Sequence, residues 1–329
     1  VALTPDHTWG AVKFNNERMI ALETAGNGVP IYENPSGGDS PAGIVAARET
    51  DRAAYLDEQG GSFRVRSYTS SSSDADWQYE FGSNFNLITA RSVAVSRDGS
   101  VIAAGALNST PDENLVIFFN AETGQQISTW TQAGGTLAAI NLTDDGARAI
   151  ISLWDEPIVV DTTTGEEIWS GDGSGAGAID YQISGIGDVI AVGGFDLKVS
   201  EWNGSTYQEI IDFDTPPSEW FGLGTTITPD GSIVASMSRE SSGQTVNVRL
   251  WDVEAQEMIA ENTLPGVPGS LQANPQSAVA TDDGSMFAFA MWGDGVGEYS
   301  EVRVYDDELN LIAYIDMPGS SFYVAMSPN

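Results

Sequence analysis

The sequence predicts an all-β protein built from consecutive four-stranded antiparallel sheets. Three observations predict it: one phrase recurs along the chain, each repeat holds short apolar runs broken by turn residues, and no stretch keeps a helical period. The phrase is clearest at Val93–Gly99 (VAVSRDG) and at Thr226–Gly231 (TITPDG). Self-similarity at a fixed period indicates a repeat architecture.

The spacing of this phrase predicts the number of repeats. Its marker is an acidic turn residue, or the glycine in its place: Asp6, Asp51, Asp98, Asp145, Gly187, Asp230 and Asp283. The mean period is about 46 residues, which suits a unit of four strands. We expect repeats at 1–43, 44–90, 91–136, 137–178, 179–221, 222–273 and 274–321, with an extra first-type strand at 322–329.

Each repeat reads as four strands in chain order. In the repeat that starts at residue 222, the expected strands are Gly222–Thr228, Ser232–Ser238, Val246–Trp251 and Met258–Asn262. Asp-Gly turns join the first strand to the second because glycine accepts the positive φ that such turns need. Serial sheets arranged radially leave only short, protected edges. The expected fold is therefore a single seven-bladed β-propeller of four-stranded antiparallel blades.

The two ends of the chain leave alternatives open. Val1–Asp6 and Val324–Asn329 are near-copies of the same first-strand phrase, so the chain has one first strand more than seven blades need. The C-terminal copy closes the first blade, or the chain is a piece of a longer protein, or the spare strand pairs with a neighbouring molecule. Eight blades, or a propeller completed by a neighbouring chain, are the corresponding alternative folds.

Several motifs resemble known propeller repeats. Val248–Asp252 (VRLWD) and Thr228–Ser236 are similar to WD40 and YVTN repeats, although the Gly-His dipeptide of WD40 blades is absent. Val160–Trp169 resembles the tryptophan-docking motif of quinoprotein (PQQ-type) propellers. The resemblance implies a propeller fold. It implies no activity and no quinone cofactor, because such motifs stabilise blades.

Composition points to an extracytoplasmic, salt-adapted protein. There are 47 acidic and 13 basic residues, for a formal net charge of −34. Such charge preserves solubility but opposes compaction, and without a Lys/Arg cluster it disfavours nucleic acid and anionic membranes as partners. No apolar run is long enough to span a bilayer. The absence of Cys is neutral on compartment. A start at Val1 rather than Met fits removal of a signal peptide or a partial chain, and we expect an extracellular, periplasmic or cell-surface location.

The sequence offers little catalytic chemistry. His7 is the only histidine, and no Gly-x-Ser-x-Gly elbow accompanies it. Ca²⁺, which takes oxygen ligands alone, is the one metal that we consider, with Asp294 and Glu298 as candidate ligands; no other cofactor is expected. Glycosylation sequons lie in predicted turns at Asn108 and Asn203. We predict no catalytic residue and expect a binding protein rather than an enzyme.

One position near the end of the second strand varies between repeats and suggests a binding face. With its neighbours it supplies an aromatic patch with one arginine: Trp154, Phe195, Trp220, Phe221, Arg239, Trp292 and Tyr299. Trp, Tyr and Arg are enriched at the energetic centres of interfaces. The expected function is a protein-interaction or self-assembly scaffold. The alternative is a carbohydrate-binding or glycoside-cleaving propeller, in which these rings stack on sugars next to carboxylates.

Overall fold

The structure is a computed structural model, and all of its described secondary structure is strand or turn. It describes residues 2–3, 9–13, 19–23, 29–34, 43–59, 62–72, 74–86, 92–154, 156–172, 180–193, 196–213, 219–240, 245–265, 275–291, 301–315 and 324–326. The all-β prediction is confirmed for these residues. A search of them finds no helix with the length and apolarity to cross a membrane.

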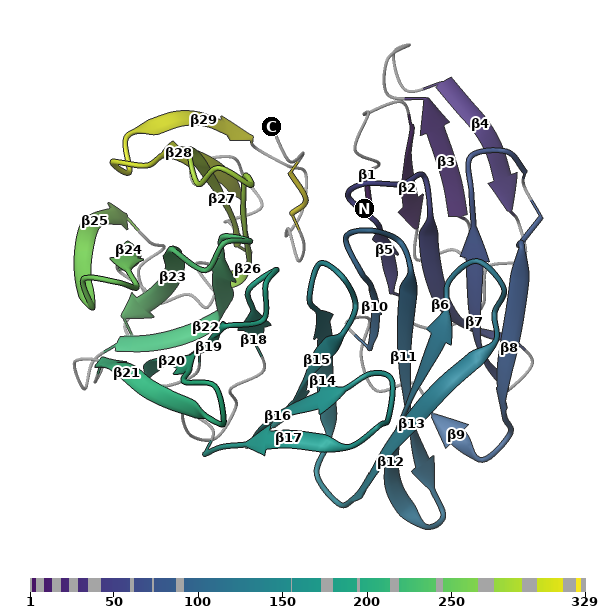
Figure 1. Cartoon of the computed structure of the whole chain (residues 1–329). Helices are drawn as coiled ribbons and strands as arrows, with labels where there is room; N and C mark the ends of the chain where they lie inside the picture. Colours follow the sequence, from purple (N-terminus) through teal and green to yellow (C-terminus); the bar gives the residue numbers. More distant parts are fainter. Residues whose placement is uncertain are drawn as a thin grey trace. The chain divides into compact units, whose positions relative to one another are not determined.

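The described strands form seven antiparallel sheets, each with four strands paired in chain order (Figure 1). The first four sheets are formed by β1 (Ala2–Leu3), β2 (Trp9–Lys13), β3 (Met19–Glu23) and β4 (Val29–Asn34); β5 (Ile44–Ala46), β6 (Ala53–Gln59), β7 (Ser62–Tyr68) and β8 (Trp77–Gly82); β10 (Val93–Val95), β11 (Val101–Ser109), β12 (Asp112–Asn120) and β13 (Gln126–Ala133); and β14 (Leu137–Leu142), β15 (Arg148–Leu153), β16 (Glu156–Asp161) and β17 (Glu167–Ser170). The last three are formed by β18 (Asp180–Ile183), β19 (Val189–Gly193), β20 (Leu197–Trp202) and β21 (Tyr207–Phe213); β22 (Glu219–Ile227), β23 (Ile233–Glu240), β24 (Thr245–Asp252) and β25 (Glu257–Pro265); and β26 (Pro275–Ala280), β27 (Met286–Met291), β28 (Val302–Asp306) and β29 (Leu311–Ile315).

One sheet departs from the expected four strands. A short strand, β9 (Phe85–Asn86), also pairs with β11, so six of the described sheets have four strands and one has five. The geometry explains the addition. β10 pairs with β11 only at residues 102–104, which leaves the same edge of this nine-residue strand open further along, and β9 pairs there with Leu107 and Asn108.

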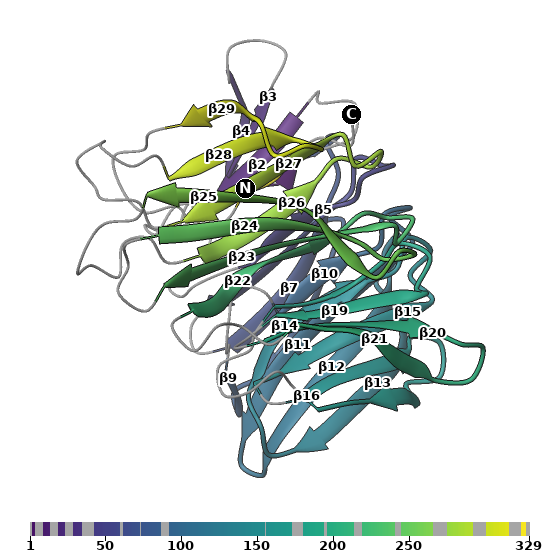
Figure 2. The same cartoon turned by 90° about the vertical axis from the view of Figure 1, so that its left-hand side faces the viewer.

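The repeat that starts at residue 222 shows how well strand positions follow from the sequence. Its four expected strands are present as β22 to β25, with ends that differ by one to three residues. Figure 2 shows these strands side by side. At the chain ends, β1 supplies the first strand of its own sheet, and the described residues 324–326 of the C-terminal copy lie in no strand.

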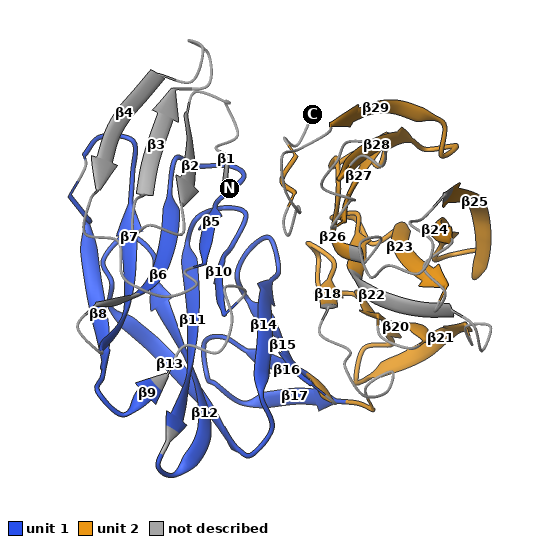
Figure 3. Ribbon diagram, turned by 180° about the vertical axis from the view of Figure 1, so that it is seen from behind, with its two compact units in different colours: residues 1–154, 158–170 blue, residues 155–157, 171–329 orange. Residues whose placement is uncertain are grey.

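The chain divides into two compact units, residues 1–154 with 158–170 and residues 155–157 with 171–329 (Figure 3). Within each unit, apolar side chains from neighbouring sheets pack together. Strand β12 shows the principle in the first unit. Phe119 packs with the sheet β5–β8, whereas Phe118 packs with the sheet β14–β17. Because successive side chains point to opposite faces, both faces of such a strand are buried and its sequence is continuously apolar.

A recurring turn joins the first and second strands of several sheets. At Thr228, the hydroxyl donates to the Asp230 carboxylate at 2.7 Å and accepts from the Ile233 N–H at 3.0 Å. Gly231 in this turn has a φ of +77°. The hydroxyl–carboxylate bond recurs at Ser96–Asp98, Thr143–Asp145 and Thr281–Asp283, which confirms the Asp-Gly turn interpretation.

Candidate functional site

Trp154 is the one predicted binding aromatic whose side chain the structure describes. It follows the last residue of β15, and its backbone N–H donates to the Thr136 carbonyl at 3.2 Å, which extends the β14–β15 pairing. Half of its surface, 50%, is exposed. An indole held by its backbone and open to solvent can stack on a flat apolar surface, such as a ligand ring or a partner side chain.

Arg239 occupies a different environment from the one expected. It lies in β23 and is 9% exposed, so it does not contribute to an exposed patch. Burial lowers the pKa of its guanidinium. The physical reason is its register. Arg239 lies opposite Val246 of β24, on the face of β23 that also carries Met237, and that face packs against the sheet β26–β29.

The side chains of the other five members of the predicted patch lie outside the described residues. Trp220 and Phe221 belong to β22, and the register places Trp220 opposite Arg239, but their side chains lie outside the described residues. Phe195, Trp292 and Tyr299 lie outside the described residues altogether. The aromatic patch therefore stays a prediction, with an exposed ring at Trp154.

The predicted metal and glycan positions divide in the same way. Asp294 and Glu298 lie outside the described residues, and the described residues hold no group of three metal-ligating side chains. Asn203 is exposed in the turn between β20 and β21, where its side-chain oxygen accepts the N–H groups of Ser205 and Thr206. Asn108 lies within β11 rather than in the predicted turn, and its oxygen accepts the Thr110 N–H.

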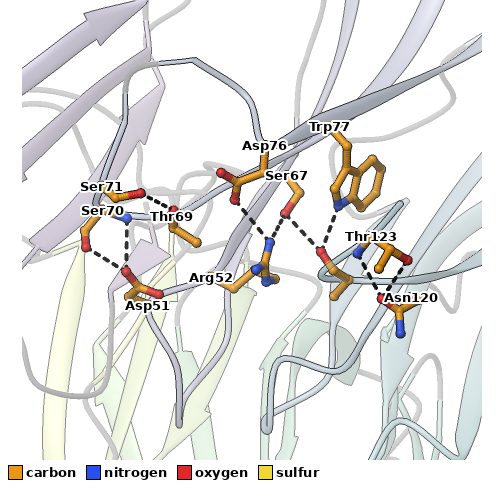
Figure 4. Close-up of polar contacts among 11 residues, drawn as sticks. Asp51, Arg52, Ser67, Thr69, Ser70, Ser71, Asp76, Trp77, Asn120 and Thr123 are labelled. Atoms are coloured by element: carbon orange, nitrogen blue, oxygen red, sulfur yellow. Dashed lines mark hydrogen bonds and ion pairs between the residues drawn. The ribbon is translucent and has the colours of Figure 1, made fainter. Parts of the chain in front are cut away.

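A polar network tethers the sheet β5–β8 to the next sheet (Figure 4). The Trp77 indole N–H donates to the Ala121 carbonyl at 2.8 Å, and its ring lies 5.4 Å from that of Phe119. Beside it, Arg52 donates to the Ser67 hydroxyl at 2.7 Å and forms an ion pair with Asp76 at 3.2 Å. The Trp77 contacts join the two sheets, whereas the Arg52 contacts link strands within the sheet β5–β8, so these polar side chains have a structural role.

The Ser-rich segment beside this network is tied to the sheet. Both the backbone N–H and the hydroxyl of Ser70 donate to the Asp51 carboxylate, at 3.2 and 2.7 Å (Figure 4). The Ser71 and Thr69 hydroxyls also bond to each other at 2.8 Å. The Asp51 carboxylate therefore anchors this polar segment to the sheet.

Two further features were missed by sequence reasoning. The first is β29, whose five residues, LIAYI, are all exposed. An apolar run without Lys or Pro in an outer strand was the available signal. The second is a buried polar face of the sheet β5–β8: Tyr55, Asp57, Arg64, Arg66 and Tyr68. Its signal was the period-two spacing of these residues, which places them on one face.

Comparison with protein-family models and with curated proteins found no match to this chain. Function must therefore be argued from the chemistry of the described surfaces.

Proposed function

We propose that the chain is a non-enzymatic β-propeller scaffold whose seven sheets are its blades, and that it self-associates through the outer strand of its last sheet. The observation that carries the proposal is the exposure of all five residues of β29. The strand ends the order β26-β27-β28-β29 and, among the described strands, pairs with β28 alone.

The apolar exposure of β29 is unusual within the described part of the chain. Four of its nine exposed large apolar side chains belong to this strand, with exposures from 48% to 61%: Leu311, Ile312, Tyr314 and Ile315. The outer strands β13 and β25 expose fewer large apolar side chains: Ile127 in β13, and Met258 and Ile259 in β25. Because an open strand edge is a template for pairing, proteins usually protect it with Lys, Pro or a bulge. No Lys or Pro lies within β29, and its pairing with β28 contains one register shift, between Val304 and Tyr305.

A second copy of the same strand is a suitable occupant for this edge. Antiparallel pairing of two β29 strands about Ala313 places Ile312 opposite Tyr314 of the other copy, twice, in a symmetric contact. Each copy carries a formal net charge of −34, so two copies repel each other. Salt screens such repulsion, so self-association should strengthen as salt rises. Binding to a basic protein partner would instead weaken as the salt concentration rises, because salt screens the attraction between opposite charges.

Sedimentation velocity at low and high NaCl tests the proposal. We expect a dimer that becomes more populated between 0.1 and about 1 M salt, where the screening length falls from about 10 to about 3 Å. The double variant Ile312→Thr/Tyr314→Thr retains strand-favouring side chains but removes apolar surface, so it should stay monomeric. The matched control is Met258→Thr/Ile259→Thr, which alters exposed apolar residues of the outer strand β25.

A wild-type protein that sediments as a monomer at every salt concentration would overturn the proposal. Equal loss of association in the β25 control would also count against it, because apolar surface in general, rather than β29, would then drive association. Circular dichroism and thermal unfolding of both variants verify that the fold is retained.

Trp154 favours a second candidate function, carbohydrate binding. Its 50% exposure leaves a ring available for stacking on a sugar. A glycan array would first identify a glycan. Titration with that glycan should quench or shift the tryptophan fluorescence of the wild type, and this change should be absent in Trp154→Ala. A blank array would exclude this candidate without affecting the first.

A further inference from the structure

The sheet β5–β8 buries a charged face that no proposed role explains. Cross-strand pairing sets Tyr55 opposite Arg66 and Asp57 opposite Arg64, with Tyr68 next along β7. All five side chains are more than nine-tenths buried. The opposite face of the same strands, which carries Leu56 and Val65, packs in the apolar cluster with the following sheet. The polar residues therefore share one face between sheets.

The charges on this face are unevenly paired. Arg64 donates two hydrogen bonds to the Asp57 carboxylate, at 3.1 and 2.9 Å, which is the geometry of a matched guanidinium–carboxylate pair. Arg66 adds a second guanidinium to an oxygen that already accepts from Arg64. Two guanidinium groups thus share one carboxylate oxygen, in a buried setting where a positive charge is costly unless it is well paired.

Two donors on this face also have no acceptor among the described residues. The Nε–H of Arg66 and the hydroxyl of Tyr55 are buried and make no hydrogen bond there. The Arg66 guanidinium lies over the rings of Tyr55 and Tyr68, at 5.2 and 5.8 Å, which orients it but supplies no acceptor. Burial, with the nearby charge of Asp57, raises the pKa of Tyr55, so its hydroxyl keeps its proton. Leaving such buried donors without an acceptor destabilises the folded protein.

We propose that this face binds one small monovalent anion, of the size of chloride or bromide, at the Nε–H of Arg66 and the hydroxyl of Tyr55. An anion suits these donors because one of them belongs to a charged guanidinium. A small ion is proposed because Tyr55 is 1% exposed and Arg66 is 5% exposed, so both donors are closed off from solvent. The site holds an ion inside the fold and is independent of the self-association of β29.

Thermal unfolding in sodium chloride, bromide and gluconate at equal ionic strength tests the site. Equal ionic strength makes general screening of the acidic chain the same in all three salts, and gluconate, a large organic anion, is the reference. We expect a higher Tm in chloride and bromide, rising with the logarithm of their concentration as for any ligand of the native state. Crystals grown with bromide should show an anomalous peak beside Arg66 and Tyr55.

Variants assign the effect to these residues. Tyr55→Phe keeps the ring and removes one donor, and we expect about tenfold weaker halide binding. Arg66→Gln removes the excess charge and should abolish the difference between chloride and gluconate. Arg52→Gln is the control, since Arg52 lies at the same sheet but is paired with Asp76 and Ser67. It should retain the full halide effect.

Three results would overturn the proposal. One is an equal Tm in chloride and gluconate for the wild type. Another is a halide effect that Tyr55→Phe leaves unchanged, which keeps the test decisive even if Arg66→Gln does not fold. The third is an acidic side chain of the chain itself, seen in a crystal structure, at the position of the expected anomalous peak.

Discussion

Asp283 shows what a single turn residue contributes to stability. Its carboxylate accepts hydrogen bonds from the hydroxyl and backbone N–H of Ser285 and from the Thr281 hydroxyl, which together lower its pKa to about 2. An unfolded Asp has a pKa of about 3.9. Because the folded pKa is the lower one, the stabilisation is present above pH 4 and is lost as the pH falls toward 2.

Asp283→Asn should therefore reduce the acid sensitivity of folding. We expect the urea midpoint of the wild type to fall between pH 4 and pH 2 more steeply than that of the variant, and the two proteins to converge at the acid end. Asp307→Asn, on the exposed turn between β28 and β29, is the control for the loss of one negative charge. Parallel pH profiles for wild type and Asp283→Asn would contradict this account.

At this scale the sequence predicts residues whose role is local. Asp98 and Asp230 were recognised because an Asp-Gly turn is a property of a few consecutive residues. The burial of Arg239 and Arg66 was not predicted, because it depends on which sheet covers a given face. Alternation along β7 could have placed Arg64 and Arg66 on one face, but only the neighbouring sheets make that face buried.

At the scale of elements, a turn between the third and fourth strands docks on the preceding sheet. In the motif that resembles the tryptophan-docking sequence, the Thr162 carbonyl accepts from the Ser128 hydroxyl of β13 at 2.6 Å. Gly165 follows in this turn with a φ of +76°, and a Cβ built on it would lie 2.2 Å from the backbone oxygen of Thr129. A backbone atom of a paired strand cannot move away cheaply.

Gly165→Ala should consequently destabilise the protein by more than its backbone strain alone. Positive φ costs a non-glycine residue about 1–2 kcal/mol, and the clash should add about 1–3 kcal/mol. Gly134→Ala is the matched control, because its φ is +75° and a Cβ added there would have no atom within 4 Å. Chemical denaturation of both variants measures the difference. Equal losses would show that the turn does not lock the two sheets.

Elements differ in how far the sequence predicts them. Strands β22 to β25 were expected because apolar runs and Asp-Gly turns define them locally. Strand β9, two residues long, was not expected because its only reason to exist is an open stretch of β11. The exposure of strand β29 was not expected, because it depends on what packs beside the strand. The features that the sequence does not predict are thus those that depend on contacts between residues far apart in the chain.

At the scale of the whole molecule, the large negative net charge should make the stability of the fold depend on salt. With a formal charge of −34, self-repulsion opposes the folded state at low salt. Several exposed carboxylates accept no hydrogen bond from the described residues and take part in this repulsion without any structural role: those of Asp74, Glu122, Glu254 and Asp307. Repulsion grows roughly with the square of the net charge, so changes at these positions should weaken it without altering the packing of the sheets.

The corresponding variant neutralises four carboxylates, which changes the net charge to −34 + 4 = −30: Asp74→Asn/Glu122→Gln/Glu254→Gln/Asp307→Asn. We expect the Tm of the wild type to rise between about 0.05 and 1 M sodium gluconate, a salt that contains no halide, as the screening length shortens. The square of the charge ratio is about 0.8, so the rise should be smaller by roughly a fifth in the variant, which should also be the more stable protein at low salt. Differential scanning calorimetry at matched protein concentration measures both quantities. An unchanged salt dependence, with no gain at low salt, would mean that local contacts rather than the summed charge determine how this acidic chain responds to salt.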